Sequence, residues 1–376
     1  MRIVIDARIY GLEHAGPGRY VKNLVDHLAV LDKKNQYIIL LRKKYFDELN
    51  LPKNFEKYLA EYNHYSFKEQ FMLLPALYKL KPDLIHFPFF NVPILYFGKF
   101  IVTIHDLTMH YFKGGEATTR GWVQSKIWRI GYHIAFAKAV YGSKKIIVPS
   151  KYVESDLVKY YKIKKRKVEV TYEGVDDAIK VTKKSASVLK KYNINNQYFI
   201  YSGSAYPHKN LKTAIEAIAL LNKKRKQKVL LVLTSSRTIF TERVLAWAKE
   251  MGVEKYIKHV GFVPDDDLAN LYTNSLAYVY PTLSEGFGLP GLEAMSAKAL
   301  VIASDIKVLK EVYGDNAIYF DPRDVKSLTE VMNKVIKMPS FKKEERIENS
   351  LVFIKKYSWK KMTKETLAVY INFTTD

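Results

Sequence analysis

The feature that most constrains this chain is a recurring unit made of a short apolar run, a polar or glycine-containing turn, and a helical pattern. The runs are rich in Val, Ile and Tyr and are not interrupted by alternating polar residues. Such runs are typical of parallel strands buried on both faces of a sheet. Six of them precede Tyr172 and six follow it, at residues 2–6, 37–41, 84–87, 100–104, 145–148 and 168–171, and at 198–201, 229–233, 257–260, 277–280, 300–303 and 317–320.

Twelve such units are too many for one ordinary sheet, and 376 residues are too many for one comfortable core. We therefore expect an α/β protein with two doubly wound, Rossmann-like domains. The expected limits are residues 1–172 for the first domain and 173–355 for the second, with a polar hinge at 173–185. Residues 356–376 close the chain, and 359–373 have the pattern of one amphipathic helix, which we expect to pack back on the first domain.

Composition limits the compartment and the kinds of site. The chain has no cysteine, which excludes disulfides and thiolate metal sites. Its N-terminus, MRIVIDAR, is a strand pattern without the apolar core of a signal peptide. The most apolar stretch, 84–104, is interrupted by Pro88, Asn91, Pro93 and Lys99, which indicates two strands and a loop rather than a spanning helix. We expect a cytoplasmic protein.

The charge is strongly basic, with 61 Lys and Arg against 38 Asp and Glu and a net +23. This balance predicts attraction to nucleic acid, to an acidic membrane face or to a phosphorylated ligand. The basic residues are dispersed and no nucleic-acid-binding motif accompanies them, so nucleic acid is not expected as a partner. Residues 144–167 hold nine Lys and Arg against two acids, which fits either binding to the inner membrane face or a solvated lysine-rich surface. Tyr152, Tyr160 and Tyr161 lie between these cations. Residues before the segment that extend the same composition are Arg120, Trp122, Lys126, Trp128 and Arg129.

Chemically distinctive residues follow the predicted strands at their carboxyl ends, where open α/β sheets bind ligands. The segment HAGPGRY follows the first strand, and histidines end the third and fourth. HKN follows the first strand of the second half, and PTLSEGFGLPGLEAM follows the fourth. The residues in question are Gly16, Gly18, Arg19, His86, His105, Asp106, Gly203, His208, Lys209, Glu285 and Glu293.

The last of these segments predicts a phosphate site. Its turn, Gly286 to Gly288, feeds a helix whose first turn contains Pro290. A glycine turn at a helix N-terminus presents backbone N–H groups and the positive end of the helix dipole, and both favour phosphate. Glu285 precedes the turn and Glu293 lies about one turn inside the helix, so one carboxylate can reach a sugar while the other accepts hydrogen bonds from a ribose. The alternative, two ordinary surface glutamates at a solvated helix start, is disfavoured by the glycine turn between them.

The segment SEGFGLPGLEAM resembles the carboxylate signature of the family 4 (group 1) glycosyltransferases, two glutamates separated by seven residues. Comparable segments run along nearly the whole chain: GPGRY, KPDLIHFPFFNVP, VTIHDL, IIVPSKYVESDL, EGVD, HKNL, HVGFV and YSW. The resemblance implies the GT-B architecture, in which two Rossmann-like domains face a central cleft. It also implies a hexosyltransferase that retains anomeric configuration and needs no metal or other cofactor. Consistent with that, the chain has no clustered Asp-x-Asp metal motif, and Asp265 to Asp267 follow Pro264 as a helix start.

The resemblance also implies roles for individual residues. Glu285 corresponds to the carboxylate near the donor sugar, Glu293 to the one that holds the ribose, and Lys209 to the lysine that neutralises the leaving diphosphate. The family commonly has an arginine before that lysine, where this chain has His208. A histidine with a pKa of about 6.5 is mostly neutral at pH 7, so Arg19 or another basic residue would have to share its task.

The remaining site residues belong to the first half. His105 corresponds to a histidine close to the reacting sugar, whereas His86 fits equally well a place in the cleft or in the core. Gly16 and Gly18 would let the backbone approach the diphosphate. The expected catalytic residues are His105, Glu285 and Lys209, and the expected donor-binding residues are Gly16, Gly18, Arg19, Gly203, His208, Lys209, Glu285, Gly286, Phe287, Gly288, Leu289 and Glu293.

The substrates are suggested by two segments of the first half. YSFKEQFMLLP and HFPFFNVP are similar to relatives that transfer mannose or rhamnose onto polysaccharide or lipid-linked glycans. They favour GDP-mannose as the donor, with a UDP-linked sugar left open. Two other functions remain: a catalytically silent carbohydrate- or nucleotide-binding protein of the same fold, suggested by His208, and a nucleotide-sugar epimerase, disfavoured by the two-glutamate motif.

Overall fold

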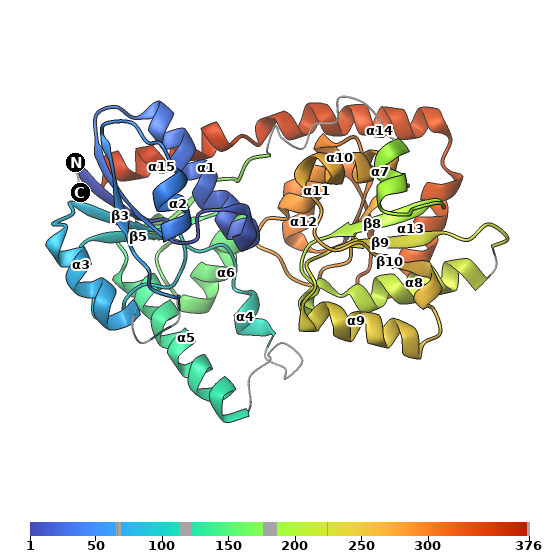
Figure 1. Ribbon diagram of the computed structural model, residues 1–376, viewed down its shortest axis with the longest axis horizontal. Coiled ribbons are helices and arrows are strands. Elements are labelled where there is room, and N and C mark those ends of the chain that lie inside the picture. Colours follow the sequence, from blue (N-terminus) through green and yellow to red (C-terminus); the bar gives the residue numbers. More distant parts are fainter. Residues whose placement is uncertain (65, 67–68, 113–121, 176–185, 224, 374–376) are drawn as a thin grey trace. The chain divides into compact units, whose positions relative to one another are not determined.

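A computed structural model of the 376-residue chain describes all residues except 65, 67–68, 113–121, 176–185, 224 and 374–376 (Figure 1). The side chains of 122, 123 and 186 also lie outside this description. The chain forms two compact units. Unit 1 contains Met1–Leu107, Arg120–Gly174 and Ser358–Asp376, and unit 2 contains Thr108–Thr119 and Val175–Tyr357. Most of the hinge expected at 173–185 falls outside the described residues.

Unit 1 is built on a parallel sheet in which the described strands follow the order β3-β2-β1-β4-β5-β6-β7. The strands are β1 (Arg2–Asp6), β2 (Gln36–Leu41), β3 (Phe55–Leu59), β4 (Leu84–Phe87), β5 (Phe100–Thr103), β6 (Ile146–Val148) and β7 (Val168–Val170). The helices are α1 (Ala15–Leu31), α2 (Lys43–Glu48), α3 (Leu74–Lys79), α5 (Trp122–Gly142), α6 (Lys151–Tyr161) and α15 (Trp359–Asn372). Ser150 caps α6 by accepting a hydrogen bond from the backbone N–H of Val153 at 3.2 Å.

Strand β3 was not expected from the sequence. Its residues, FEKYL, carry Glu56 and Lys57 beside Phe55, so the run does not have the apolar pattern used to find the other strands. β3 pairs in parallel with β2, Phe55 opposite Tyr37, and lies at the edge of the sheet. An edge strand tolerates polar side chains because it is not covered on all sides.

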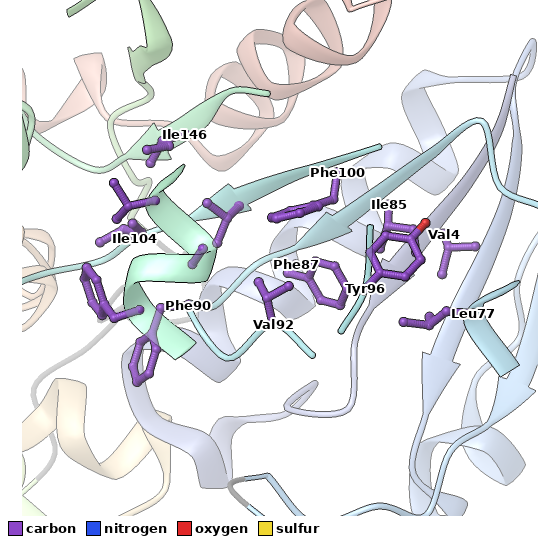
Figure 2. Close-up of a cluster of buried hydrophobic side chains, with 14 of the residues drawn as sticks. Val4, Leu77, Ile85, Phe87, Phe90, Val92, Tyr96, Phe100, Ile104 and Ile146 are labelled. Atoms are coloured by element: carbon purple, nitrogen blue, oxygen red, sulfur yellow. The ribbon is translucent and has the colours of Figure 1, made fainter. Parts of the chain in front are cut away.

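The core of unit 1 lies under β4, β5 and β6 (Figure 2). Ile85 and Phe87 from β4 meet Phe100 from β5 and Ile146 from β6, and all four are at most 1% exposed. Phe90, Val92 and Tyr96 fold back onto them from the loop after β4. Each such side chain contributes about 1.5–3 kcal/mol relative to an exposed one, so the β4–β5 region is firmly held.

Helix α15 packs against α1 within unit 1. Its Tyr370 hydroxyl lies 2.6 Å from Nδ1 of His86, and Nε2 of His86 lies 2.8 Å from the hydroxyl of Thr103. His86 is fully buried, and burial lowers its pKa to about 3, so the ring is neutral. The question left open by the sequence is therefore answered: His86 is a packed core residue that fixes the C-terminal helix.

Unit 2 has a parallel sheet with the order β10-β9-β8-β11-β12-β13 among its described strands. They are β8 (Tyr198–Ser202), β9 (Leu230–Thr234), β10 (Ile257–His259), β11 (Tyr278–Tyr280), β12 (Val301–Ser304) and β13 (Ala317–Phe320). Helices α8 (Leu211–Lys223) and α9 (Ile239–Glu250) lie on one side of the strands, and α10 (Asp265–Asn274) and α11 (Leu289–Ser296) on the other (Figure 1). The remaining helices are α4 (Thr108–Tyr111), α7 (Ala186–Lys191), α12 (Lys307–Tyr313), α13 (Val325–Lys337) and α14 (Ser340–Phe353).

Both sheets are thus doubly wound, as expected. In each, the strand order reverses once, between β1 and β4 in unit 1 and between β8 and β11 in unit 2. A crevice at the carboxyl ends of such neighbouring strands is where open α/β sheets bind ligands.

Candidate active site

Lys209 and Glu285 meet at the reversal point of the unit 2 sheet. Lys209 follows β8, Glu285 follows β11, and the two strands are neighbours. The Lys209 ammonium nitrogen lies 2.5 Å from Oε1 of Glu285, and the side chains are 16% and 12% exposed. Two residues 76 positions apart in the chain are therefore joined in a partly buried ion pair.

Four buried tyrosine side chains lie around Glu285. Tyr201, Tyr278, Tyr280 and Tyr313 are at most 1% exposed. Burial raises the pKa of each well above its usual value, and the charge of Glu285 raises it further. The carboxylate is thus paired with one cation among neutral phenols, in surroundings where charge interactions are stronger than in water.

Asn210 ties together the two loops that carry this pair. It has a left-handed φ of 56°, and its amide donates to the carbonyls of Pro281 at 3.0 Å and Pro322 at 2.8 Å. The backbone N–H of Leu283 donates to the carbonyl of His208 at 2.8 Å. Asn210 was not among the residues expected at the site, although an Asn between a turn and a helical run is a recognisable signal because Asn tolerates the left-handed region.

The glycine turn before α11 is held from behind by Tyr313. Gly288 caps the helix with a φ of +102°, and the Tyr313 hydroxyl donates to its carbonyl at 2.5 Å. A Cβ at Gly288 would come within 2.6 Å of that hydroxyl, and one at Gly291 would also collide with the Tyr313 ring. Both the backbone conformation and the space therefore require glycine at 288. No sequence pattern pointed to Tyr313, which lies 25 residues further along the chain.

The other residues expected in this segment contribute in different ways. Phe287 is 3% exposed and packs edge-on against Tyr357 with ring centroids 5.5 Å apart. Leu289 is 7% exposed. Their side chains are therefore part of the core of unit 2, and what they can offer a ligand is backbone N–H. Glu293 lies inside α11 and is also 7% exposed, which is rare for a carboxylate without a specific role.

His208 and Gly203 complete the loop after β8. Gly203 has a φ of +135°, and His208 sits in a short 3-10 turn with its ring stacked on that of Tyr206, 5.9 Å between centroids. The centroid of the Phe112 ring lies 5.8 Å from that of the His208 ring. His208 and Lys209 therefore share one short turn, and the imidazole ring lies beside two aromatic rings.

His105 lies in unit 1, just beyond β5. Its Nδ1 is 3.2 Å from the Glu173 carboxylate, and its Nε2 is 3.0 Å from the carbonyl of Pro88. Both partners offer acceptor oxygens to the ring. In this arrangement both ring nitrogens are engaged, so a sugar hydroxyl would have to replace the Pro88 carbonyl to contact His105.

The loop after β1 gives its two glycines different roles. A Cβ at Gly16 would meet nothing within 4 Å, whereas one at Gly18 would collide with the backbone carbonyls of Gly11 and Ile9. Glycine at 18 is therefore explained by the packing of α1 against the preceding loop. Arg19 lies on α1, in unit 1, and does not belong to the unit that carries Lys209.

Within the described part of the chain, no group of three or more His, Cys, Asp or Glu side chains is arranged to hold a metal ion. Asp265, Asp266 and Asp267 form the first turn of α10, as expected from the sequence. Asp267 is paired with Lys191 at 2.5 Å and accepts from the Tyr192 hydroxyl at 2.8 Å.

Two family models cover the chain almost from end to end. The model described as Glycosyltransferase Family 4 matches residues 15–179, and the model described as Glycosyl transferases group 1 matches residues 182–350. The chain belongs to the family 4 (group 1) glycosyltransferases.

Individual relatives agree with this assignment. The glycosyltransferase is 26% identical over 390 residues to O-antigen chain mannosyltransferase B of Escherichia coli, an alignment that covers 98% of this chain and 99% of the relative. It is 28% identical over 239 residues to O-antigen chain mannosyltransferase RfbU of Salmonella typhimurium, covering 63% of this chain and 61% of that one. A solved glycosyltransferase structure from Rickettsia africae superimposes with a TM-score of 0.72 at 19% identity, covering 100% of this chain and 99% of that one.

The fold of the glycosyltransferase is therefore GT-B, and its family is a retaining one that takes a nucleotide-sugar donor and an acceptor. The matches assign no role to single residues, so the parts played by Lys209, Glu285 and the others rest on their geometry.

Proposed function

We propose that this glycosyltransferase moves mannose from GDP-mannose to a glycan or lipid-linked acceptor, with retention of configuration. The names of the Escherichia coli and Salmonella typhimurium relatives support the sugar. The Lys209–Glu285 pair beside the glycine turn of α11 is the observation that carries the site. Unit 2 binds the donor in this proposal, and unit 1 binds the acceptor.

Each residue at the reversal point of unit 2 has a task that its position allows. The Lys209 ammonium carries three N–H groups, so it donates hydrogen bonds to the donor diphosphate as well as to Glu285. The backbone of Gly286 to Leu289 and the dipole of α11 meet the same phosphates. Glu285 accepts from a hydroxyl of the sugar, and the buried Glu293 accepts from the ribose. Gly203 and His208 line the loop beside Lys209.

The proposed reaction breaks the bond between the anomeric carbon and the diphosphate oxygen. The acceptor hydroxyl oxygen forms the new bond to that carbon on the same face, and its proton passes to the departing phosphate. The products are the α-linked glycoside and GDP. Lys209 and the N-terminus of α11 stabilise the negative charge that grows on the diphosphate, and such electrostatic stabilisation is usually the greatest contribution to catalysis of this kind. No metal or other cofactor has a part in the proposal.

Unit 1 supplies the second set of proposed residues. His105, fixed by Glu173, would face the reacting sugar once it exchanges the Pro88 carbonyl for a hydroxyl. Gly16 and Arg19, at the start of α1, would meet the diphosphate from this unit, and Gly18 keeps that helix start close to its preceding loop.

The setting we propose is the cytoplasm, at the inner face of a membrane that presents the acceptor. A net charge of +23 favours an anionic lipid surface over a neutral one. No helix in the described part of the chain is both long and apolar enough to cross a bilayer.

A panel of GDP, UDP, dTDP and ADP in thermal unfolding tests the donor site. A ligand that binds only the folded state at a hundredfold excess over Kd stabilises it by about 2.7 kcal/mol. We expect the largest shift with GDP, and its loss in Lys209→Met. The matched control is Lys212→Met, which changes a lysine three positions away that lies over the Trp247 ring. A shift with none of the four nucleotides, or an equal GDP shift in Lys209→Met, would contradict the proposal.

Assays of the unchanged chain also test the two alternative functions, a silent binding protein and an epimerase. A silent binding protein would shift with GDP but consume no GDP-mannose when a mannosylated acceptor is added. An epimerase would convert GDP-mannose to another GDP-sugar without an acceptor. Release of GDP that depends on acceptor supports the transferase over both.

A further inference from the structure

Helix α5 of unit 1 turns a row of large apolar side chains toward solvent. Ile127, Ile130 and Tyr141 are 62%, 62% and 60% exposed, and Ile134 is 48% exposed. Their spacing of three, four and seven residues puts all four within about 60° of one another around a helix with 3.6 residues per turn. We call these four residues the α5 stripe. Figure 1 shows α5 extending away from the strands of unit 1.

The opposite face of α5 already holds the helix in place. Tyr132, Phe136 and Val140 are at most 5% exposed and belong to the core of unit 1. The Phe90 ring packs 5.1 Å from each of the Tyr132 and Phe136 rings. The α5 stripe is therefore a second apolar face, and the core does not need it.

The surroundings of the α5 stripe are basic. The chain has no Asp or Glu between Glu116 and Glu154, and this stretch of 37 residues contains seven Lys and Arg. On the helix, Lys126 flanks one side of the stripe and Lys138 the other. The Lys138 ammonium lies 4.3 Å from the ring of Phe97, which is 78% exposed and adds a fifth apolar side chain beside the stripe.

We propose that the α5 stripe inserts into the headgroup region of an anionic lipid bilayer, with Lys126 and Lys138 against the lipid phosphates. A helix with isoleucine and aromatic side chains on one face, cations beside them and no acid is the composition that binds in the plane of such an interface. The proposal deepens the proposed function, since it rests on an acceptor presented at a membrane, and it names the surface that docks.

The segment first expected to form this surface, 144–167, fits less well. Lys145 pairs with Glu169 at 2.8 Å, Lys165 pairs with Glu154 at 3.2 Å, and Lys167 donates to the carbonyl of Tyr141 at 2.9 Å. The apolar side chains of this segment also form no exposed row, since Val153 and Leu157 are at most 1% exposed and Tyr160 is 44% exposed. Of the residues expected to extend it, Arg120 and the side chain of Trp122 lie outside the described residues, whereas Lys126, Trp128 and Arg129 belong to α5.

Co-sedimentation of the full chain with lipid vesicles tests the proposal. We expect binding to vesicles of mixed phosphatidylglycerol and phosphatidylcholine and weaker binding to pure phosphatidylcholine. The variant Ile127→Glu/Ile130→Glu should bind the mixed vesicles at least about tenfold more weakly, because it loses two inserting side chains and adds two charges that the lipid repels. Ile127→Leu/Ile130→Leu should bind as the unchanged chain does.

The matched control is Phe341→Glu/Val352→Glu on α14 of unit 2. These two apolar residues are 64% and 67% exposed, and the change in charge is the same. We expect this control to keep vesicle binding. Ile127→Ser/Ile130→Ser repeats the test without new charge if the glutamate variant does not fold.

Three outcomes would overturn the proposal: no preference of the unchanged chain for phosphatidylglycerol, equal binding by Ile127→Glu/Ile130→Glu, or an equal loss in the α14 control. A dimer without vesicles that Ile127→Glu/Ile130→Glu converts to monomers, with vesicle binding unchanged, would overturn it too and assign the stripe to a second copy of the chain. The GDP shift in solution separates this proposal from the proposed function. Normal vesicle binding without a GDP shift would contradict the donor site alone, and a normal GDP shift without vesicle binding would contradict the α5 stripe alone.

Discussion

Replacing Gly291 by Ala should destabilise unit 2, although helix propensity alone predicts the opposite. Gly291 lies inside α11 with ordinary helical geometry, where Ala is favoured over Gly by about 1 kcal/mol. A Cβ there would collide with the phenol oxygen and ring of Tyr313, which is fully buried. A ring held on all sides cannot swing aside as the end of a flexible chain can.

The expected magnitude follows from these contacts. Overpacking of this kind costs about 1–3 kcal/mol. Displacing the Tyr313 hydroxyl from the Gly288 carbonyl, now 2.5 Å away, adds about 1–3 kcal/mol, because a buried acceptor loses its donor. After the gain in helix propensity, we expect a net loss of about 1–5 kcal/mol. Because the same contact holds the glycine turn, the stabilisation of the protein by GDP should fall as well.

Gly131→Ala is the matched control. Gly131 also lies inside a helix, α5, but a Cβ there would meet nothing within 4 Å. This variant should be stabilised by about 0.5–1 kcal/mol. Differential scanning calorimetry of the full chain measures both, and a change of 1 kcal/mol corresponds to about 2–4 °C for a unit of this size. Equal and positive shifts for the two variants would refute the packing of Tyr313 against α11.

Three further predictions follow from the described contacts. Lys209→Met should lower turnover of GDP-mannose by about 10²–10³, as loss of a charge-stabilising group does. It should also destabilise unit 2, because Glu285 is left partly buried without its cation. Turnover is measured as GDP release, and a rate within twofold of the Lys212→Met control would contradict the prediction. Glu293→Gln should raise the Kd of GDP by about tenfold, since a neutral amide is a weaker acceptor for the ribose, and unchanged affinity by calorimetry would remove Glu293 from the donor site. The pKa of His86 is about 3 in the folded chain and about 6.5 when unfolded, so its contribution to stability is complete above pH 6.5 and declines as the pH falls, by about 2 kcal/mol at pH 5. Urea unfolding at pH 7.5 and 5.0 should show a smaller loss in His86→Gln than in the unchanged chain, and an equal loss would contradict a neutral buried His86.

The sheets were largely predictable because their strands are buried on both faces and read as continuous apolar runs. The expected strands agree with the structure to within about one residue at each end, which is the normal uncertainty of strand limits. Strand β3, at the edge of its sheet, was not predicted because Glu56 and Lys57 interrupt the apolar pattern. The pairing of Lys209 with Glu285 could be anticipated only in part, since strand-end position places both at one edge but does not show that β8 and β11 are neighbours.

The supports of the site could not be predicted, because they act over long separations in the chain. Tyr313 holds the turn at Gly288 from 25 residues away, and Tyr370 holds His86 from 284 residues away. Gly18 shows the complementary difficulty. Its position after a strand suggested a ligand, whereas its missing side chain makes room for the carbonyls of Gly11 and Ile9. Whether a glycine contacts a ligand or a neighbouring backbone segment depends on the tertiary packing, which the spacing of residues in the sequence does not reveal.

The most direct test of retaining mannosyl transfer is NMR of the anomeric products formed from GDP-α-mannose and a mannose-terminated lipid acceptor. We predict an α-linked mannoside that accumulates with GDP in the unchanged chain and in Lys212→Met, and that falls by about 10² or more in Lys209→Met. A β-linked product, or the same rate of product formation in Lys209→Met, would contradict retaining transfer at the Lys209–Glu285 site.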